Sequence, residues 1–275
     1  MRTSVSLFAD DFAHGISPDR WVLRPVGDLP RGDGVITTTP DGVVVVSSGV
    51  NAATGEPCFV STEHMTWQAM PAAGIPGFDV AETGVLAAEV TLAAGTFGTA
   101  AHPFGDAVAD PDRDLRLGAV GVIAVDLATG MIFNFSVTNG AVFALYERLP
   151  GEGRSSFCSA VQIAERSPGQ VHRLGFRYDR AAGTVSWLVD GVEAFSVDRI
   201  GFRSADARTL IDRGGVDELA APARLLFGLC TFTLLDAVGP TGGAPLVTGH
   251  GQAAQTAWGQ GARIDLRRFE VSATS

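Results

Sequence analysis

The sequence predicts an all-β protein, a sandwich of two antiparallel sheets. Segments of alternating apolar and polar residues recur along the whole chain, Gly, Pro, Asn or Asp separates most of them, and helical periodicity is scarce. Hydrophobic residues make up 46% of the 275 residues and there are 34 glycines, enough for a large core and many turns. Sandwiches of this length occur as one unit, so we expect residues 1–275 to form a single domain.

Eleven segments have the pattern of strands. In chain order they are residues 42–48, 84–94, 117–127, 131–139, 141–149, 156–165, 171–179, 184–191, 192–198, 224–235 and 262–273. Short turns rich in Gly, Asn and Asp join several of them, at residues 126–130, 138–140, 179–183 and 189–191. The best helical segment, residues 212–226, is short and is interrupted by Pro222.

Two long stretches break the strand pattern. Residues 97–114 and 236–262 are rich in Gly, Ala, Pro and Asp, and loops of this length in a compact domain are usually functional rims or disordered segments. His102 lies in the first and Trp258 in the second, so both are candidate ligand-binding residues. The alternative is that the two stretches are surface loops with incidental polar residues.

Composition excludes several classes of partner. The net charge of −10 argues against nucleic acid, and no apolar stretch approaches the length of a membrane span. The three cysteines are far apart and no Cys/His spacing suits a metal, so we expect neither metal nor cofactor. The first twelve residues lack the apolar segment of a secretory signal, which predicts a cytoplasmic protein. All 20 basic residues are Arg, and this usage is typical of a GC-rich genome such as that of an actinobacterium.

Residues 171–195, VHRLGFRYDRAAGTVSWLVDGVEAF, resemble a hairpin of the concanavalin-A-like lectin/glucanase superfamily, most closely the laminarinase- and lichenase-type glycoside hydrolases. Other segments agree in order, namely residues 10–21, 84–95, 224–237 and 264–273. The chain also resembles an uncharacterised actinobacterial group of this fold. The resemblance implies a jelly roll of two curved sheets with long rim loops and a groove on its concave face.

The strand MIFNFSVTN, residues 131–139, stands where these glucanases carry Glu-x-Asp-x-Glu. Its polar side offers Asn134, Ser136 and Thr138, none of which is a carboxylate, so the resemblance argues against retaining glycoside hydrolysis. The next strand is expected to turn Phe143 and Leu145 to the core, and therefore Tyr146 and Arg148 to the polar side. This row is either one wall of a binding cleft or an ordinary solvated sheet face.

Two carboxylates are candidate acids or bases. Glu89 is the one charge in an apolar strand and, by resemblance, enters the groove; Asp236 begins the second long loop. With Tyr146 they are the candidate catalytic residues, while Asn134, Ser136, Thr138, Arg148, His102 and Trp258 are candidate substrate-binding residues. Trp187 alternates with Val185 and Val189, which favours the core.

Three functions fit these patterns. The first is a biosynthetic enzyme that binds a bulky, oxygenated, largely apolar small molecule such as a polyketide and promotes its cyclisation or isomerisation, for example acetal formation. The second is a non-catalytic carbohydrate-binding module, although the chain has only four Trp and two Tyr to serve as sugar platforms. The third is a divergent glycoside hydrolase that uses other carboxylates, such as Glu89 and Asp236.

Overall fold

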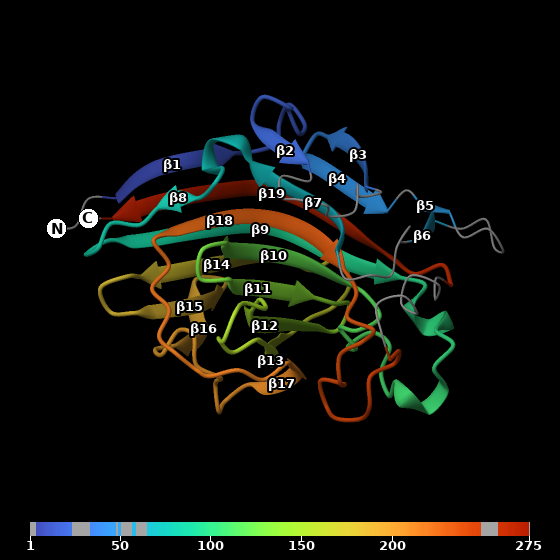
Figure 1. Ribbon diagram of the computed structural model, residues 1–275. Helices are drawn as coiled ribbons and strands as arrows, with labels where there is room; N and C mark the ends of the chain where they lie inside the picture. The colour runs from blue at the N-terminus through green and yellow to red at the C-terminus, as the bar shows by residue number, and fades with distance from the viewer. Residues whose placement is uncertain are drawn as a thin grey trace.

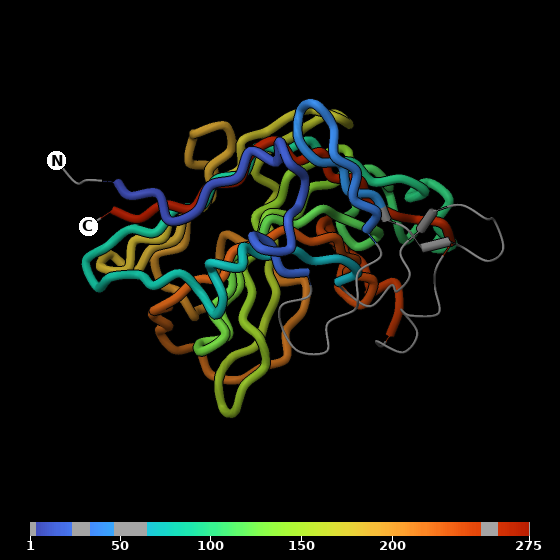
Figure 2. Tube along the Cα trace, turned by 90° about the horizontal axis from the view of Figure 1, so that it is seen from above, coloured from blue at the N-terminus to red at the C-terminus, as the bar shows by residue number. Residues whose placement is uncertain are grey.

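The computed structural model describes residues 4–23, 34–47, 49–50, 57–58, 65–248 and 258–274. Apart from three short 3-10 helices, the regular structure consists of strands, which form two large antiparallel sheets stacked face to face (Figure 1). Seen from above, the chain ends lie together at one end of the sandwich and the loop that carries η2 (Thr99–Ala101) and η3 (Gly105–Ala107) lies at the other (Figure 2). The predicted sandwich of antiparallel sheets is confirmed.

The eight-stranded sheet has the order β16-β15-β14-β9-β19-β4-β3, and β1 pairs with β19. Its strands are β1 (Ser4–Asp10), β3 (Gly34–Thr39), β4 (Gly42–Ser47), β9 (Val85–Phe97), β14 (Val171–Asp179), β15 (Thr184–Val189), β16 (Val192–Val197) and β19 (Gly261–Thr274).

The nine-stranded sheet has the order β17-β13-β12-β11-β10-β18-β7-β2, and β8 pairs with β18. Its strands are β2 (Trp21–Leu23), β7 (Met65–Pro71), β8 (Phe78–Asp79), β10 (Ala119–Asp126), β11 (Met131–Val137), β12 (Ala141–Arg148), β13 (Phe157–Glu165), β17 (Arg208–Asp212) and β18 (Arg224–Phe232). The remaining elements are β5 (Gly49–Val50), which pairs with β6 (Pro57–Cys58), and η1 (Ala72–Gly74). Each of the eleven segments predicted from alternation contains a strand.

The main core lies between the two sheets. One buried cluster takes alternate residues from both of them, for example Leu86 and Trp187 from the eight-stranded sheet and Phe133 and Phe135 from β11. Trp187 meets Phe133 edge to face, with ring centroids 5.8 Å apart, and its indole Nε1 donates to the backbone carbonyl of Asn134 at 3.1 Å. The predicted core position of Trp187 is confirmed, and this residue links the two sheets directly.

Buried arginines hold the loops at both ends of β12. Near its start, Arg166 donates to the carbonyls of Thr138 (2.5 Å) and Ala94 (2.8 Å), which belong to different sheets. At its end, the buried Arg148 forms an ion pair with Glu218 at 2.9 Å. Burial lowers the pKa of Arg166. Several carbonyl acceptors compensate for the lost hydration of such a cation, so these arginines serve as structural clamps.

Other expectations have a mixed outcome. Cys158 and Cys230 are free and buried, as packed thiols should be, while the side chain of Cys58 lies outside the described residues. In the described part of the chain no helix is long and apolar enough to cross a membrane. Residues 212–226 form no helix and instead connect the end of β17 to β18. The single domain over residues 1–275 and the cytoplasmic location stay predictions.

The hairpin between β15 and β16 turns at Asp190 and Gly191, both with positive φ (54° and 84°), as in a type I′ turn. The Asp190 carboxylate accepts from the Arg173 backbone amide at 2.8 Å and contacts His172 Nδ1 at 2.9 Å. Partial burial opposes ionisation, but these two hydrogen bonds outweigh it and hold the pKa of Asp190 below its ordinary value.

We predict that Asp190→Asn lowers the free energy of unfolding at pH 7 by about 1 kcal/mol or less, because the carboxylate is half exposed. A lowered folded-state pKa stabilises above the unfolded pKa of about 4 and this stabilisation is lost as the pH falls. Urea unfolding of both proteins at pH 7 and pH 3 should therefore show a difference that shrinks at the lower pH. A difference that stays constant or grows would contradict the assignment.

Candidate functional site

The outer face of the nine-stranded sheet, which points away from the other sheet, carries the candidate site. On β11, Phe133 and Phe135 point into the main core, so Asn134 and Ser136 point outward, as the alternation predicts. Thr138 does not join this row, since its hydroxyl bonds to the backbone of Ala141 within the turn that follows.

The expectation for β12 is wrong. Val137 pairs with Val142 and Phe133 with Tyr146, so the face that carries Val142 and Tyr146 is the core face. The Tyr146 ring stacks on Phe133, its hydroxyl accepts from the Gly201 amide at 2.6 Å, and burial raises its pKa well above the ordinary value. Tyr146 is therefore a neutral core residue. Arg148, two residues after Tyr146 and therefore on the same face of β12, is the buried arginine described above.

The corrected register turns Phe143, Leu145 and Glu147 to the outer face, beside Ser136, Asn134 and Ile132. Ile132, Phe143 and Leu145 belong to a second apolar cluster on this face, which also includes Leu115 and residues from the segment after β18. That segment, residues 233–238, starts beside Arg116 and reaches β17, where the Val238 amide donates to the Leu210 carbonyl. It therefore covers part of the outer face, and Leu234 and Ala237 pack there.

In the described part of the chain, three buried polar atoms on this face have no hydrogen-bond partner: Gln68 Oε1, Asn134 Oδ1 and Ser136 Oγ. Strand register places Gln68, Cys230, Gly121 and Ser136 in one row across β7, β18, β10 and β11. Gly121 lies under both Cys230 and Asn134, where an added Cβ would come within 2.4 Å of the thiol and 3.1 Å of Asn134 Oδ1. Small residues thus form the floor between the polar groups.

Two carboxylates border the same face. Glu147 is the cross-strand neighbour of both Ile132 and the buried Cys158, and Asp236 lies in the covering segment between Leu235 and Ala237. Burial raises the pKa of Cys158 well above its ordinary value, and the negative charges of Glu147 and Asp236 add to this. Both carboxylates therefore lie near one thiol. The structure thus puts Asp236, a candidate from the sequence, at this face. Glu147 is not a candidate from the sequence, because the predicted orientation of β12 turns it toward the core.

Glu89 is not part of this site. It lies on β9, on the outer face of the eight-stranded sheet, where it is half exposed and forms an ion pair with Arg173 at 3.3 Å. The expectation that it enters the groove is wrong because its strand belongs to the opposite sheet. The alternation of β9 correctly predicts that Glu89 points away from the core. Alternation distinguishes the two faces of a strand, but it does not show which of the two sheets the strand joins.

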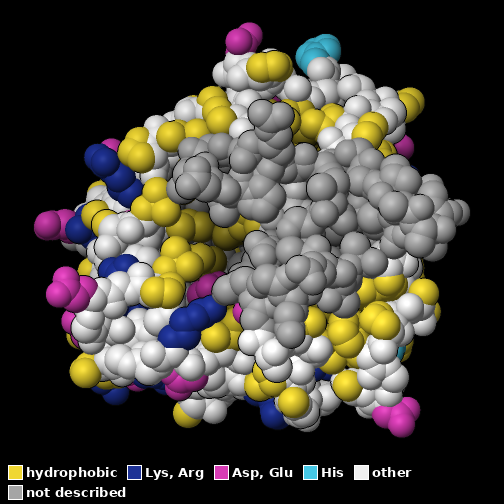
Figure 3. Space-filling model, turned by 45° about the vertical axis from the view of Figure 1, so that its right-hand side comes forward, with side chains coloured by type: hydrophobic (Ala, Val, Ile, Leu, Met, Phe, Trp, Pro, Cys, Tyr) yellow, Lys and Arg dark blue, Asp and Glu magenta, His cyan; other side chains and the backbone are white. Residues whose placement is uncertain are grey.

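His102 and Trp258 come together at the rim. Their rings both contact Phe104, at centroid distances of 6.1 and 5.5 Å, and Trp258 Nε1 donates to the Gly98 carbonyl. The fully buried Arg116 holds these loops. It forms an ion pair with Asp114 and donates to the carbonyls of Ala107 and Ala244, from the first and second long loop. On this side of the molecule hydrophobic side chains gather in a recess, with charged side chains beside it (Figure 3).

Among the described residues, no group of three or more His, Cys, Asp or Glu side chains is arranged to hold a metal ion. The chemical groups that the outer face offers are therefore amides, a hydroxyl, two carboxylates and apolar side chains. Such a set can bind oxygen atoms of a ligand and transfer protons.

Comparison with known proteins places the chain in a family. Residues 6–275 match a family described as "Family of unknown function (DUF6081)", and the chain belongs to it. It is 27% identical to the uncharacterized protein L829 of Acanthamoeba polyphaga mimivirus, over 46% of this chain and 42% of that protein. It thus spans less than half the length of this curated relative.

The structure is similar to two carbohydrate-acting proteins. One is a Crh5 transglycosylase, with a TM-score of 0.51 and 12% identity over 97% of this chain and 84% of that one. The other is the endo-β-1,3-glucanase of Pyrococcus furiosus, with a TM-score of 0.51 and 9% identity over 100% of this chain and 96% of that one. At these identities the likeness establishes the shared fold, and the predicted concanavalin-A-like jelly roll is confirmed.

We predict that Asn134→Leu leaves the free energy of unfolding unchanged or raises it by about 1 kcal/mol, because an unpartnered buried acceptor is replaced by an apolar group of similar shape. Asn139→Leu is the matched control. Asn139 bonds to both backbone groups of Thr96 and to Asp112, so its loss should cost about 2–3 kcal/mol. Urea denaturation measures both, and an equal loss in the two variants would show that Asn134 serves the fold.

Proposed function

We propose that this member of the DUF6081 family binds a small, largely apolar molecule with hydroxyl groups on the outer face of the nine-stranded sheet. The observation that carries the proposal is the set of three buried, unpartnered polar atoms on Gln68, Asn134 and Ser136. Leaving such an atom unsatisfied costs about 1–3 kcal/mol, and folded proteins rarely retain it without a use. Each hydroxyl of a ligand bound between β7 and β11 would donate to one of these oxygens and remove its share of the cost.

The surroundings favour an apolar ligand body over a sugar. Ile123, Phe143 and Leu145 border the polar row, and the neighbouring Met70 and Phe232 belong to the same apolar cluster. A sugar ring carries a hydroxyl on most carbons and would lose hydration at each one against aliphatic side chains. A long polysaccharide also needs an open groove, whereas residues 233–238 pass over part of this face.

The two carboxylates suggest acid–base chemistry on such a ligand. In ring closure by addition of a hydroxyl to a carbonyl, a C–O bond forms, the hydroxyl proton passes to a base, and the carbonyl oxygen receives a proton from an acid. Glu147 and Asp236 are the residues proposed for these two roles. Holding the flexible ligand in its folded shape contributes several kcal/mol to lowering such a barrier. The proposed reaction class is therefore cyclisation or isomerisation.

A divergent carbohydrate-active enzyme is the second candidate. The fold shared with the transglycosylase and the glucanase supports it. So do the two carboxylates that border the outer face of this chain. Against it stands β11 itself, where Ile132, Asn134 and Ser136 occupy the outward positions and supply no nucleophile. Catalysis on sugars would have to rely on Glu147 and Asp236 from other elements.

A thermal-shift comparison separates the two candidates. We expect menthol, an apolar ring with one hydroxyl, to raise the melting temperature of the native protein, and β-1,3-gluco-oligosaccharides to leave it unchanged. The double variant Asn134→Leu/Ser136→Ala should reduce the menthol shift strongly, because two of the three acceptors are gone. Glu89→Gln, on the opposite sheet, should keep it.

The other results are equally informative. A shift with the oligosaccharides alone would overturn the apolar-ligand proposal and favour the carbohydrate-active enzyme. A menthol shift that persists undiminished in the double variant would place the binding site elsewhere, and no shift with any probe would overturn the proposed site.

A further inference from the structure

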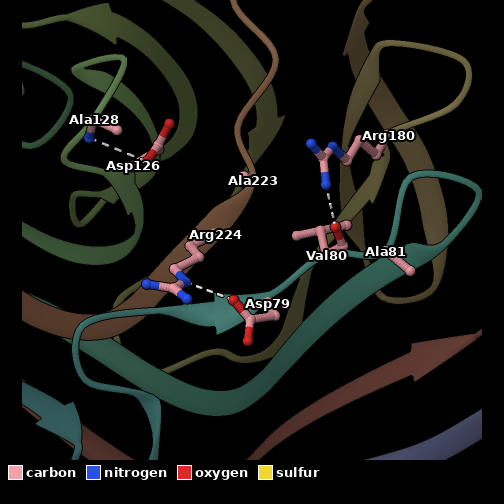
Figure 4. Close-up of a pocket in the computed structure, with 8 residues that line it drawn as sticks. All are labelled: Asp79, Val80, Ala81, Asp126, Ala128, Arg180, Ala223 and Arg224. Carbon is pink, nitrogen blue, oxygen red and sulfur yellow. Dashed lines mark hydrogen bonds and ion pairs between the residues drawn. The ribbon is translucent and has the colours of Figure 1, made fainter.

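A pocket separate from the outer face lies beside β8 and the β14–β15 turn (Figure 4). In Figure 1 these elements lie at the end of the sandwich opposite the rim loops. The volume of the pocket is about 560 Å³. Residues 79–81 after β8, the β10–β11 turn, the β14–β15 turn and the start of β18 line it, so both sheets contribute. It shares no residue with the outer-face site.

One positive charge in this pocket has no acidic partner. The half-buried Arg180 donates through Nη1 to the Val80 carbonyl at 2.6 Å, and its backbone amide donates to the Gly84 carbonyl. Within the described part of the chain, its guanidinium forms no ion pair with a carboxylate. In Figure 4 it stands across the pocket from the β10–β11 turn. A neutral carbonyl satisfies one donor of a guanidinium but leaves its charge uncompensated.

The second guanidinium is only weakly neutralised. Arg224 contacts Asp79 through Nε at 2.5 Å, but the carboxylate of Asp79 is 78% exposed. Exposed pairs of this kind contribute about 0–1 kcal/mol, so a competing anion can displace the carboxylate. The pair also raises the pKa of Arg224, which keeps the cation charged at all ordinary pH values.

The other carboxylate of the pocket, that of Asp126, already accepts hydrogen bonds from its own turn. Asp126 is buried, and its carboxylate accepts from the amides of Ala128 and Thr129 and from the Thr129 hydroxyl at 2.6 Å. These donors come from its own turn, so Asp126 serves the turn and is not held by either arginine. The pocket therefore contains two cations, one displaceable carboxylate and one carboxylate held by its turn.

We propose that this pocket binds a small oxyanion, the carboxylate or phosphate group of a metabolite, at the guanidinium of Arg180, with the charge of Arg224 adding to the positive potential of the pocket. Guanidinium groups bind such oxygens through paired, charge-assisted hydrogen bonds, which suits a planar carboxylate or one edge of a phosphate. Bound there, the anion would neutralise Arg180 and join segments of both sheets. The proposal is independent of the function assigned to the outer face.

The test is a two-dimensional amide NMR titration of the full chain at constant ionic strength, with inorganic phosphate in one arm and acetate in the other. We expect saturable shifts of the Val80, Ala81 and Ala223 amides in at least one arm, and the arm with the higher affinity identifies the preferred anion. Arg180→Gln should weaken binding at least tenfold. Arg177→Gln, an exposed arginine on β14, the strand that precedes the Arg180 turn, should leave the affinity unchanged.

Asp79→Asn provides a second measurement that does not depend on how well the Arg180 variant folds. Removal of the competing carboxylate should tighten binding severalfold, because the pocket then has two cations and only one carboxylate. Linear, non-saturating shifts in both arms, or equal affinities in the Arg180 and Arg177 variants, would overturn the proposal. So would weaker binding in Asp79→Asn.

Discussion

The hydrogen bond from the Trp187 indole to the Asn134 carbonyl is the contact on which the arrangement of the outer face depends. It crosses the sandwich from β15 to β11 and accompanies the edge-to-face packing of Trp187 on Phe133. Together these contacts commit Phe133 and Phe135 to the interior. Because side chains alternate along a strand, the same commitment sends Asn134 and Ser136 outward. A one-residue slip would bury the polar row between the sheets, at a large desolvation cost.

Because of this constraint, the interior stabilises the fold while the outer face of the nine-stranded sheet is available for a ligand. In the interior and at both ends of the sandwich, Tyr146, Arg148 and Arg166 each bond to backbone groups of neighbouring segments. Among the described residues, buried polar atoms without a partner occur in several places, Trp67 Nε1 and Ser159 Oγ among them, but the outer face brings three such oxygens beside one apolar cluster. Proteins that break the rule of satisfied buried polarity at one place usually do so at a functional site. The proposed ligand site rests on this group of three oxygens.

Much of the fold could be predicted from sequence, because alternation and turn residues act locally. The eleven segments, the tight turn at residues 189–191 and the core position of Trp187 follow from such local rules. Which residues of β12 face the core could not be predicted in this way. Val142 and Ala144 compete with Phe143 and Leu145 for the core, and both faces of this strand are buried and largely apolar. Only the pairing with β11 decides which of these residues face the core. That pairing puts Glu147, and not Tyr146 and Arg148, on the outer face.

Long-range placement accounts for the other differences. The assignment of Glu89 failed because strand patterns do not reveal which sheet a strand joins, and the cover over the outer face depends on where residues 233–238 cross β11–β13. The most direct test of the central claim is a crystal structure after a soak in cyclohexanol. The account predicts cyclohexanol bound on the outer face, with its hydroxyl within hydrogen-bond distance of Gln68, Asn134 or Ser136. Cyclohexanol bound only at other sites, with these oxygens bonded to side chains of the protein itself, would contradict it.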